Sequence, residues 1–76
     1  MKIKNGDRVM VSERNPNHLG HGITAYAGWQ GKVTELQDNG GFTLDCGDRS
    51  LVISKSKKLL LEDINGSWVL IDHKIK

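Results

Sequence analysis

Short stretches of alternating apolar and polar positions run along most of the chain. Between Asp7 and Glu13, Val9 and Val11 occupy every second position, which is the period of a strand with one buried face. The same period predicts three further strands: from about Trp29 to Leu36, from Phe42 to Cys46 and from Ser50 to Ser54. In the last two we expect these side chains to point inward: Phe42, Leu44, Cys46, Leu51 and Ile53.

Turn signals separate these stretches. Three Asn-Gly dipeptides begin at Asn5, Asn39 and Asn65, and Gly47-Asp48 adds a fourth turn. Asn-Gly favours tight hairpin turns because both residues tolerate positive φ. The turns are too closely spaced for long helices. Residues 1–76 are therefore predicted to form a single all-β domain of five to six short antiparallel strands.

The last predicted hairpin carries large apolar side chains on both faces. Asn65-Gly66 lies between two apolar stretches, Leu59–Ile64 and Ser67–His73. A two-residue turn there makes Leu61 face Leu70. The two faces are then Leu60, Ile64, Val69 and Ile71 on one side, and Leu59, Leu61, Trp68 and Leu70 on the other. An alternative for the first stretch is a single helical turn over the open end of the barrel.

A small barrel can bury only one face of such a hairpin inside itself. Soluble monomers rarely leave a contiguous apolar patch exposed, and a twofold axis is the usual way to cover a self-complementary patch. The sequence therefore predicts a homo-oligomer, most simply a dimer. Its predicted interface consists of Leu59, Leu61, Trp68 and Leu70.

Composition limits the classes of partner and the cellular compartment that we expect for the protein. The chain has 76 residues, 37% of them hydrophobic, and a net charge of +2, which is too small to predict nucleic-acid binding from charge alone. The single cysteine, Cys46, excludes an internal disulfide and suits a reducing compartment. No apolar stretch has the length of a membrane helix or of a signal peptide core. We expect a cytoplasmic protein without a membrane partner.

The first half of the chain resembles a known barrel type. Gly6-Asp7-Arg8-Val9 opens the first strand, and Gly28-Trp29-Gln30-Gly31-Lys32-Val33 opens the second after a long loop. This order resembles the GDxV…GxxGxV opening of SH3-like and KOW-type barrels. The resemblance implies an SH3-like partly open barrel with one long loop after the first strand. It does not imply a function, because such barrels bind peptides, RNA, ribosomal proteins and metals.

The same segments are similar to the plasmid-borne type II dihydrofolate reductases, which are short SH3-like barrels that form a tetramer around one pore. That family carries a Val-Gln-Ile-Tyr signature where this chain has Ser50-Leu51-Val52-Ile53-Ser54. Val52 stands in place of the glutamine and Ser54 in place of the tyrosine. The resemblance therefore supports the fold and argues against the reductase activity.

The loop from Arg14 to Gly28 is long for so small a domain. Long ordered loops tend to carry function, and the resemblance places this one beside an aromatic ligand groove. The alternative is an insertion without a role. We predict ligand or partner contacts at His18, His21, Tyr26 and Trp29, with both aromatic residues near the surface.

Lys55, Lys57 and Lys58 form a short basic cluster near Arg49. Together with an exposed aromatic side chain, they would form a surface that contacts phosphates and stacks on bases. The alternative is an edge strand that its lysines protect from aggregation.

Chemistry-bearing motifs are few. The soft metal ligands are His18, His21, His73 and Cys46. His18 and His21 could lie close together on the loop, but a metal site would still need a third and fourth ligand, from His73, Cys46 or a carboxylate. The alternative is two solvated loop histidines. The sequence has no nucleophile elbow, phosphate loop or paired-carboxylate signature. We predict no catalytic residues, no metal and no cofactor.

Three functions remain open at this point. The preferred one is a non-enzymatic interaction module that self-associates and binds a protein partner. The alternatives are a KOW-like nucleic-acid-binding domain and a small enzyme built at an oligomer pore, like the type II reductases.

Overall fold

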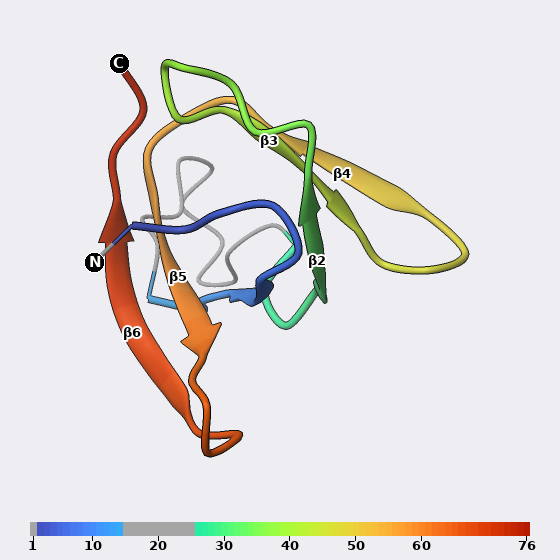
Figure 1. The fold of residues 1–76 in the computed structure, drawn as a ribbon, viewed down its shortest axis with the longest axis vertical. Helices are drawn as coiled ribbons and strands as arrows, with labels where there is room; N and C mark the ends of the chain where they lie inside the picture. The colour runs from blue at the N-terminus through green and yellow to red at the C-terminus, as the bar shows by residue number, and fades with distance from the viewer. Residues whose placement is uncertain (1, 15–25) are drawn as a thin grey trace.

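The computed structural model describes residues 2–14 and 26–76. Within them the chain forms one six-stranded antiparallel sheet, in the order β4-β3-β2-β1-β5-β6 (Figure 1). The strands are β1 Arg8–Val11, β2 Gln30–Thr34, β3 Phe42–Asp45, β4 Ser50–Ile53, β5 Lys57–Glu62 and β6 Trp68–His73. The predicted all-β class is confirmed. The alternative of a helical turn at 59–64 is wrong, because most of that segment belongs to β5.

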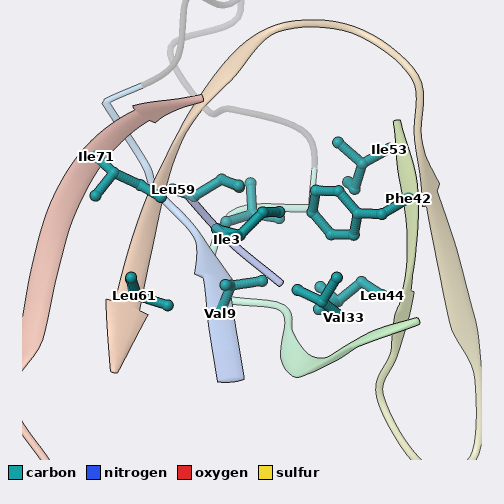
Figure 2. Packing of buried hydrophobic residues seen from close by; sticks show 10 residues of the cluster. Ile3, Val9, Val33, Phe42, Leu44, Ile53, Leu59, Leu61 and Ile71 are labelled. Atoms are coloured by element: carbon teal, nitrogen blue, oxygen red, sulfur yellow. The ribbon is translucent and has the colours of Figure 1, made fainter. Parts of the chain in front are cut away.

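The sheet bends so that two halves face each other, β1–β5–β6 on one side and β2–β3–β4 on the other (Figure 1). Figure 2 shows side chains from both halves meeting between them, with Ile3 in the middle. Because β4 and β6 remain edges of this sheet, the barrel is partly open, as predicted. The buried apolar side chains of the described residues are Ile3, Val9, Val11, Val33, Phe42, Leu44, Ile53, Leu59, Leu61 and Ile71.

The strands follow the predicted alternation. In β1, Val9 and Val11 are buried and Met10 between them faces outward. In β4, Ile53 is buried and Leu51 packs against the core, whereas Val52 is 70% exposed. Residues on one face of a strand recur every second position, so these neighbours divide between the core and the outer surface.

The carboxyl end of the chain contacts the turn between β2 and β3. Lys76 N donates to Asn39 O (2.9 Å), and His73 Nε2 lies 2.7 Å from Gly40 O in the turn between β2 and β3. The His73 ring also packs edge-on against Phe42, 5.5 Å between centroids. Gly40 has φ +100°, and a Cβ there would lie 2.8 Å from Lys74 O. This close approach therefore requires glycine.

The register of the last hairpin differs by one residue from the predicted one. Asp63 N donates to Ser67 O (2.8 Å) and Gly66 N donates to Asp63 O (3.0 Å), so the loop has three residues, 64–66, instead of two. The Asp63 carboxylate also accepts hydrogen bonds from Asn65 N (2.8 Å) and Ser67 N (2.9 Å). This is the three-residue loop with glycine at positive φ. The predicted pairing of Leu61 with Leu70 is therefore wrong.

The observed register changes the composition of both hairpin faces. Leu59 pairs with Ile71 and Leu61 with Val69 on the inner face, while Leu60 pairs with Leu70 on the outer face. Leu59 is fully buried and Leu61 nearly so. These two residues therefore belong to the core and cannot form an exposed interface, which corrects half of the predicted interface set. Ile64, predicted on a strand face, lies fully exposed at the hairpin tip.

Among the described residues, no helix is long and apolar enough to cross a membrane.

Candidate functional site

The outer face of β1–β5–β6 carries a row of apolar side chains. The pairings Met10↔Leu60 and Leu60↔Leu70 align these three residues across the three strands. Trp68, two positions before Leu70 on β6, lies on the same face. We call these four residues, Met10, Leu60, Trp68 and Leu70, the outer stripe. Leu70 is 42% exposed, and the other three are half-buried.

Charged residues lie on both sides of the outer stripe. On one side, Arg8 Nε lies 3.5 Å from Glu62 Oε2, and Glu62 pairs with Trp68. On the other side, Lys58 pairs with Asp72, whose carboxylate lies 3.1 Å from Lys74 Nζ. An apolar row between two charged rows resembles the cross-section of an interface, with an apolar centre and a polar rim.

A groove of about 540 Å³ opens over the outer stripe. All four residues of the stripe line it. The other described residues that line it are Val11 and both ends of the connection between β1 and β2, residues 12–14 and 27–28.

Backbone hydrogen bonds hold both ends of that connection beside the groove. Val11 N donates to Trp29 O and Gly28 N donates to Val11 O, both at 2.9 Å. Ser12 N donates to Lys58 O at 3.3 Å, and the buried Ser12 side chain accepts a hydrogen bond from Arg14 N at 3.1 Å. The connection therefore leaves and re-enters the sheet at the rim of the groove. His18 and His21 lie outside the described residues.

An aromatic cluster lies where the connection ends. The Tyr26 and Trp29 rings meet edge to face, 5.1 Å between centroids, and Arg49 Cζ lies 3.9 Å from the Trp29 centroid. A guanidinium at this distance over an indole makes a cation–π contact. Tyr26, at φ +64°, is 48% exposed, whereas Trp29 is half-buried and packs against the core. The predicted surface position is confirmed for Tyr26 and holds only in part for Trp29.

The predicted lysine cluster is not one surface. Lys57 and Lys58 are consecutive residues of β5, so their side chains point to opposite faces of the sheet. Lys57 pairs with His73, and Lys58 with Asp72. Burial lowers the pKa of the Lys57 ammonium, and the neighbouring charge of Lys55 lowers it further. Among these three lysines, Lys58 shares the outer face with the stripe.

Cys46 lies half-buried beside β3, with Sγ 3.8 Å from Leu44 O. Burial raises the pKa of its thiol; Arg49 opposes this effect, and Asp45 and Asp48 add to it. Such a thiol stays protonated at neutral pH. Among residues 2–14 and 26–76, no group of three or more His, Cys, Asp or Glu side chains has the arrangement of a metal site.

A scan against protein-family models, a search of curated proteins and a search of solved structures each found no match to this chain.

Two residues of the outer stripe were missing from the predicted site residues. Met10 lies between two inward-facing valines, and Leu60 lies between two inward-facing leucines. The sequence did contain one signal: each of these apolar residues lies at a strand position whose side chain points away from the core. For Leu60, that signal could be used only once the register of the last hairpin was known.

Proposed function

We propose that the protein is a small interaction module that binds another protein on the outer stripe. The observation that carries this proposal is the apolar row Met10–Leu60–Leu70, which crosses three strands on the outer face and opens into a groove. The inner face of the same strands already supplies the core. The outer apolar side chains are therefore not needed to fill the barrel.

Binding at this surface would be stabilised mainly by burial of apolar area. A large apolar side chain contributes about 1.5–3 kcal/mol when it is fully buried. Each residue of the stripe would contribute only part of that amount, because all four are already partly covered in the free chain. The charged rows beside the stripe would set the orientation of the partner and the rate of encounter more than the affinity.

The residues that line the groove favour binding. Met10, Leu60, Trp68 and Leu70 give it apolar side chains, and Glu13 and Arg14 are charged residues of its lining. Mostly apolar surface with a few polar groups is typical of binding sites.

The test compares two matched variants, Leu60→Thr on the outer stripe and Val52→Thr on the outer face of β4. Threonine suits a strand in both places. Proteins retained from the host by the wild-type chain are identified, produced and titrated calorimetrically against all three forms. We expect Leu60→Thr to weaken binding at least about tenfold, which corresponds to about 1.4 kcal/mol, and Val52→Thr to leave it unchanged. Equal affinity for all three forms would contradict the proposal.

A second candidate function is nucleic-acid binding, which the cluster of Tyr26, Trp29 and Arg49 favours. Proteins that bind single-stranded nucleic acids often stack bases on exposed aromatic rings and on arginine side chains, and Tyr26, Trp29 and Arg49 place such groups together. Fluorescence anisotropy with labelled single-stranded RNA and DNA, at about 50 and 200 mM salt, tests it because phosphate contacts weaken as salt rises. For this function, Arg49→Gln would weaken binding and Leu60→Thr would not.

A further inference from the structure

We propose that a second copy of this chain pairs, antiparallel and with a twofold axis at Leu70, with the outer edge of β6, which no other strand of the described residues covers. This inference goes beyond the proposed function, because edge pairing uses the backbone of β6 and leaves the outer stripe open to a different protein. Two observations carry it, the backbone groups presented at the edge and the length of β6; the strand pairing then sets the axis, and the two outer stripes would join.

The backbone groups at the outer edge of β6 belong to Trp68, Leu70 and Asp72. Asp63 and Ser67 form the hydrogen-bonded pair that closes the hairpin. Hydrogen-bonded and non-hydrogen-bonded pairs alternate along an antiparallel ladder. Val69 and Ile71 therefore form hydrogen bonds with β5, and Trp68, Leu70 and Asp72 direct their N–H and C=O groups away from β5. The bond from Ser12 N to Lys58 O agrees, because Lys58 is the β5 partner of Asp72 and directs its carbonyl toward β1.

The strand β6 has few of the features that usually keep edge strands apart. Natural edges are short or carry charged side chains or proline, whereas the six residues of β6, Trp-Val-Leu-Ile-Asp-His, include one carboxylate and neither lysine nor proline. The other edge, β4, has four residues. By the same alternation from the bond between Cys46 N and Arg49 O, β4 presents Ser50 and Val52 at its edge. The longer edge, with more backbone groups to offer a second strand, is β6.

A twofold axis at Leu70 satisfies every presented group. Leu70 then faces its own copy, and Trp68 of each chain faces Asp72 of the other. Moving the axis to Ile71 would place Trp68 opposite Lys74, beyond the end of β6, and moving it to Val69 would place Asp72 opposite Gly66, before the strand begins. With the axis at Leu70, the two Asp72 residues are about 14 Å apart along the strands, at about 3.4 Å per residue. That separation exceeds the screening length of about 10 Å at 0.1 M salt.

The pairing also makes the two outer stripes continuous. Met10, Leu60 and Leu70 of one chain would continue through Leu70 into the same row of the other chain. The joined row crosses six strands, a span of about 24 Å at about 4.8 Å per strand spacing. A partner protein would then bind across both copies.

Disulfide trapping tests the register directly. In a Cys46→Ser background, Leu70→Cys places two thiols on residues whose Cα atoms would be about 5.5 Å apart, within the range of a disulfide. Mild oxidation should convert most of this variant to a covalent dimer. Val52→Cys, 70% exposed on the other edge, is the matched control and should form little. Trp68→Cys and Asp72→Cys should not dimerise alone but should link to each other when mixed.

Equal cross-linking of Leu70→Cys and Val52→Cys would overturn the proposal. Self-linking of Trp68→Cys would overturn the register.

Sedimentation equilibrium gives an independent test without cross-links. At high micromolar concentration we expect a mass twice the 8.4 kDa of one chain. Asp72→Pro removes one outward N–H and no bond to β5, so it should shift the mass toward the monomer, whereas Asp72→Ala should remain dimeric. A wild-type monomer, or an Asp72→Pro dimer as stable as the wild type, would contradict edge pairing.

Leu60→Thr distinguishes this inference from the proposed function. It should keep the dimer and lose the partner. Loss of the dimer in Leu60→Thr would show that the outer face, not the β6 edge, joins the copies.

Discussion

The outer faces of the two halves of the sheet are built from different residues. On β2–β3–β4 the outward positions are Gln30, Lys32, Thr34, Thr43, Asp45, Ser50 and Val52, and on β1–β5–β6 they are Arg8, Met10, Lys58, Leu60, Glu62, Trp68, Leu70 and Asp72. Polar residues dominate the first set, whereas a row of apolar residues crosses the second.

The inner faces do not explain this difference. Both halves contribute buried aliphatic side chains to one core (Figure 2), so packing makes the same demand on each. A sheet face that contacts only water is expected to carry polar side chains, as the outer face of β2–β3–β4 does. We propose that another molecule covers the apolar row on β1–β5–β6, which is the basis of the proposed function.

The largest expected effect is a difference in stability between substitutions on the two faces of β5. Leu59→Ala should cost about 2–5 kcal/mol, because it leaves a cavity at a fully buried position. Leu60→Ala, one residue further and on the outer face, should cost less than about 1.5 kcal/mol in the free chain. Urea unfolding of both variants measures the difference. Equal costs would mean that the outer stripe is part of the core.

An intermediate effect is expected where the carboxyl end contacts the turn between β2 and β3. Gly40→Ala should destabilise the fold more than Gly66→Ala. Both residues have positive φ, but only at Gly40 would a Cβ meet backbone, at 2.8 Å from Lys74 O. Replacing glycine at positive φ costs about 1–2 kcal/mol, and the clash adds to it at Gly40. Thermal unfolding of the two variants decides this, and equal melting temperatures would show that this contact contributes little.

A smaller effect is expected at the aromatic cluster. Tyr26→Ala should cost within about 1 kcal/mol, because the ring is largely exposed. Arg49→Gln should also cost below about 1 kcal/mol, the usual size of an exposed cation–π contact. Chemical denaturation of both variants is the measurement. A loss of several kcal/mol at Tyr26 would place that ring in the core.

The smallest effect is a change in the titration of Cys46. Because burial raises the pKa of the thiol, thiolate absorbance should rise with a midpoint above the ordinary value of 9.0. Arg49→Gln should move the midpoint higher still, since Arg49 opposes the shift. The folded state binds the thiol proton more tightly than the unfolded state, so this group's contribution to stability is complete below pH 9.0 and is lost as pH rises through the folded pKa. A midpoint at or below 9.0 would contradict the burial of Cys46.

The sequence predicted the strands better than it predicted the site. Period-2 alternation identified the first four strands, because one buried face per strand dictates that pattern, and the turn signal Asn65-Gly66 between two apolar stretches identified the last two. The register of the last hairpin failed because Asn65-Gly66 was interpreted as a two-residue turn, whereas the Asp63 carboxylate stabilises a three-residue loop. One residue of register exchanges the two faces of a strand, and the predicted interface therefore included Leu59 and Leu61.

The other features that the sequence did not predict depend on contacts between residues far apart in the chain. Met10 and Leu60 come together only through strand pairing, which has no local signal in the sequence. The contact of the chain end with Gly40 joins residues more than thirty positions apart. Trp68 and Leu70 were predicted as interface residues and lie on the outer face, and their role in binding stays a prediction.

The most direct test of the outer stripe is hydroxyl-radical footprinting of the chain, free and in complex with its isolated partner. Met10 and Trp68 on the stripe, and Tyr26 in the aromatic cluster, carry side chains that such radicals oxidise readily, so one experiment reports on both surfaces. We predict that the partner slows oxidation of Met10 and Trp68 severalfold and leaves Tyr26 unchanged. Unchanged oxidation of Met10 and Trp68, with protection at Tyr26 instead, would contradict the account.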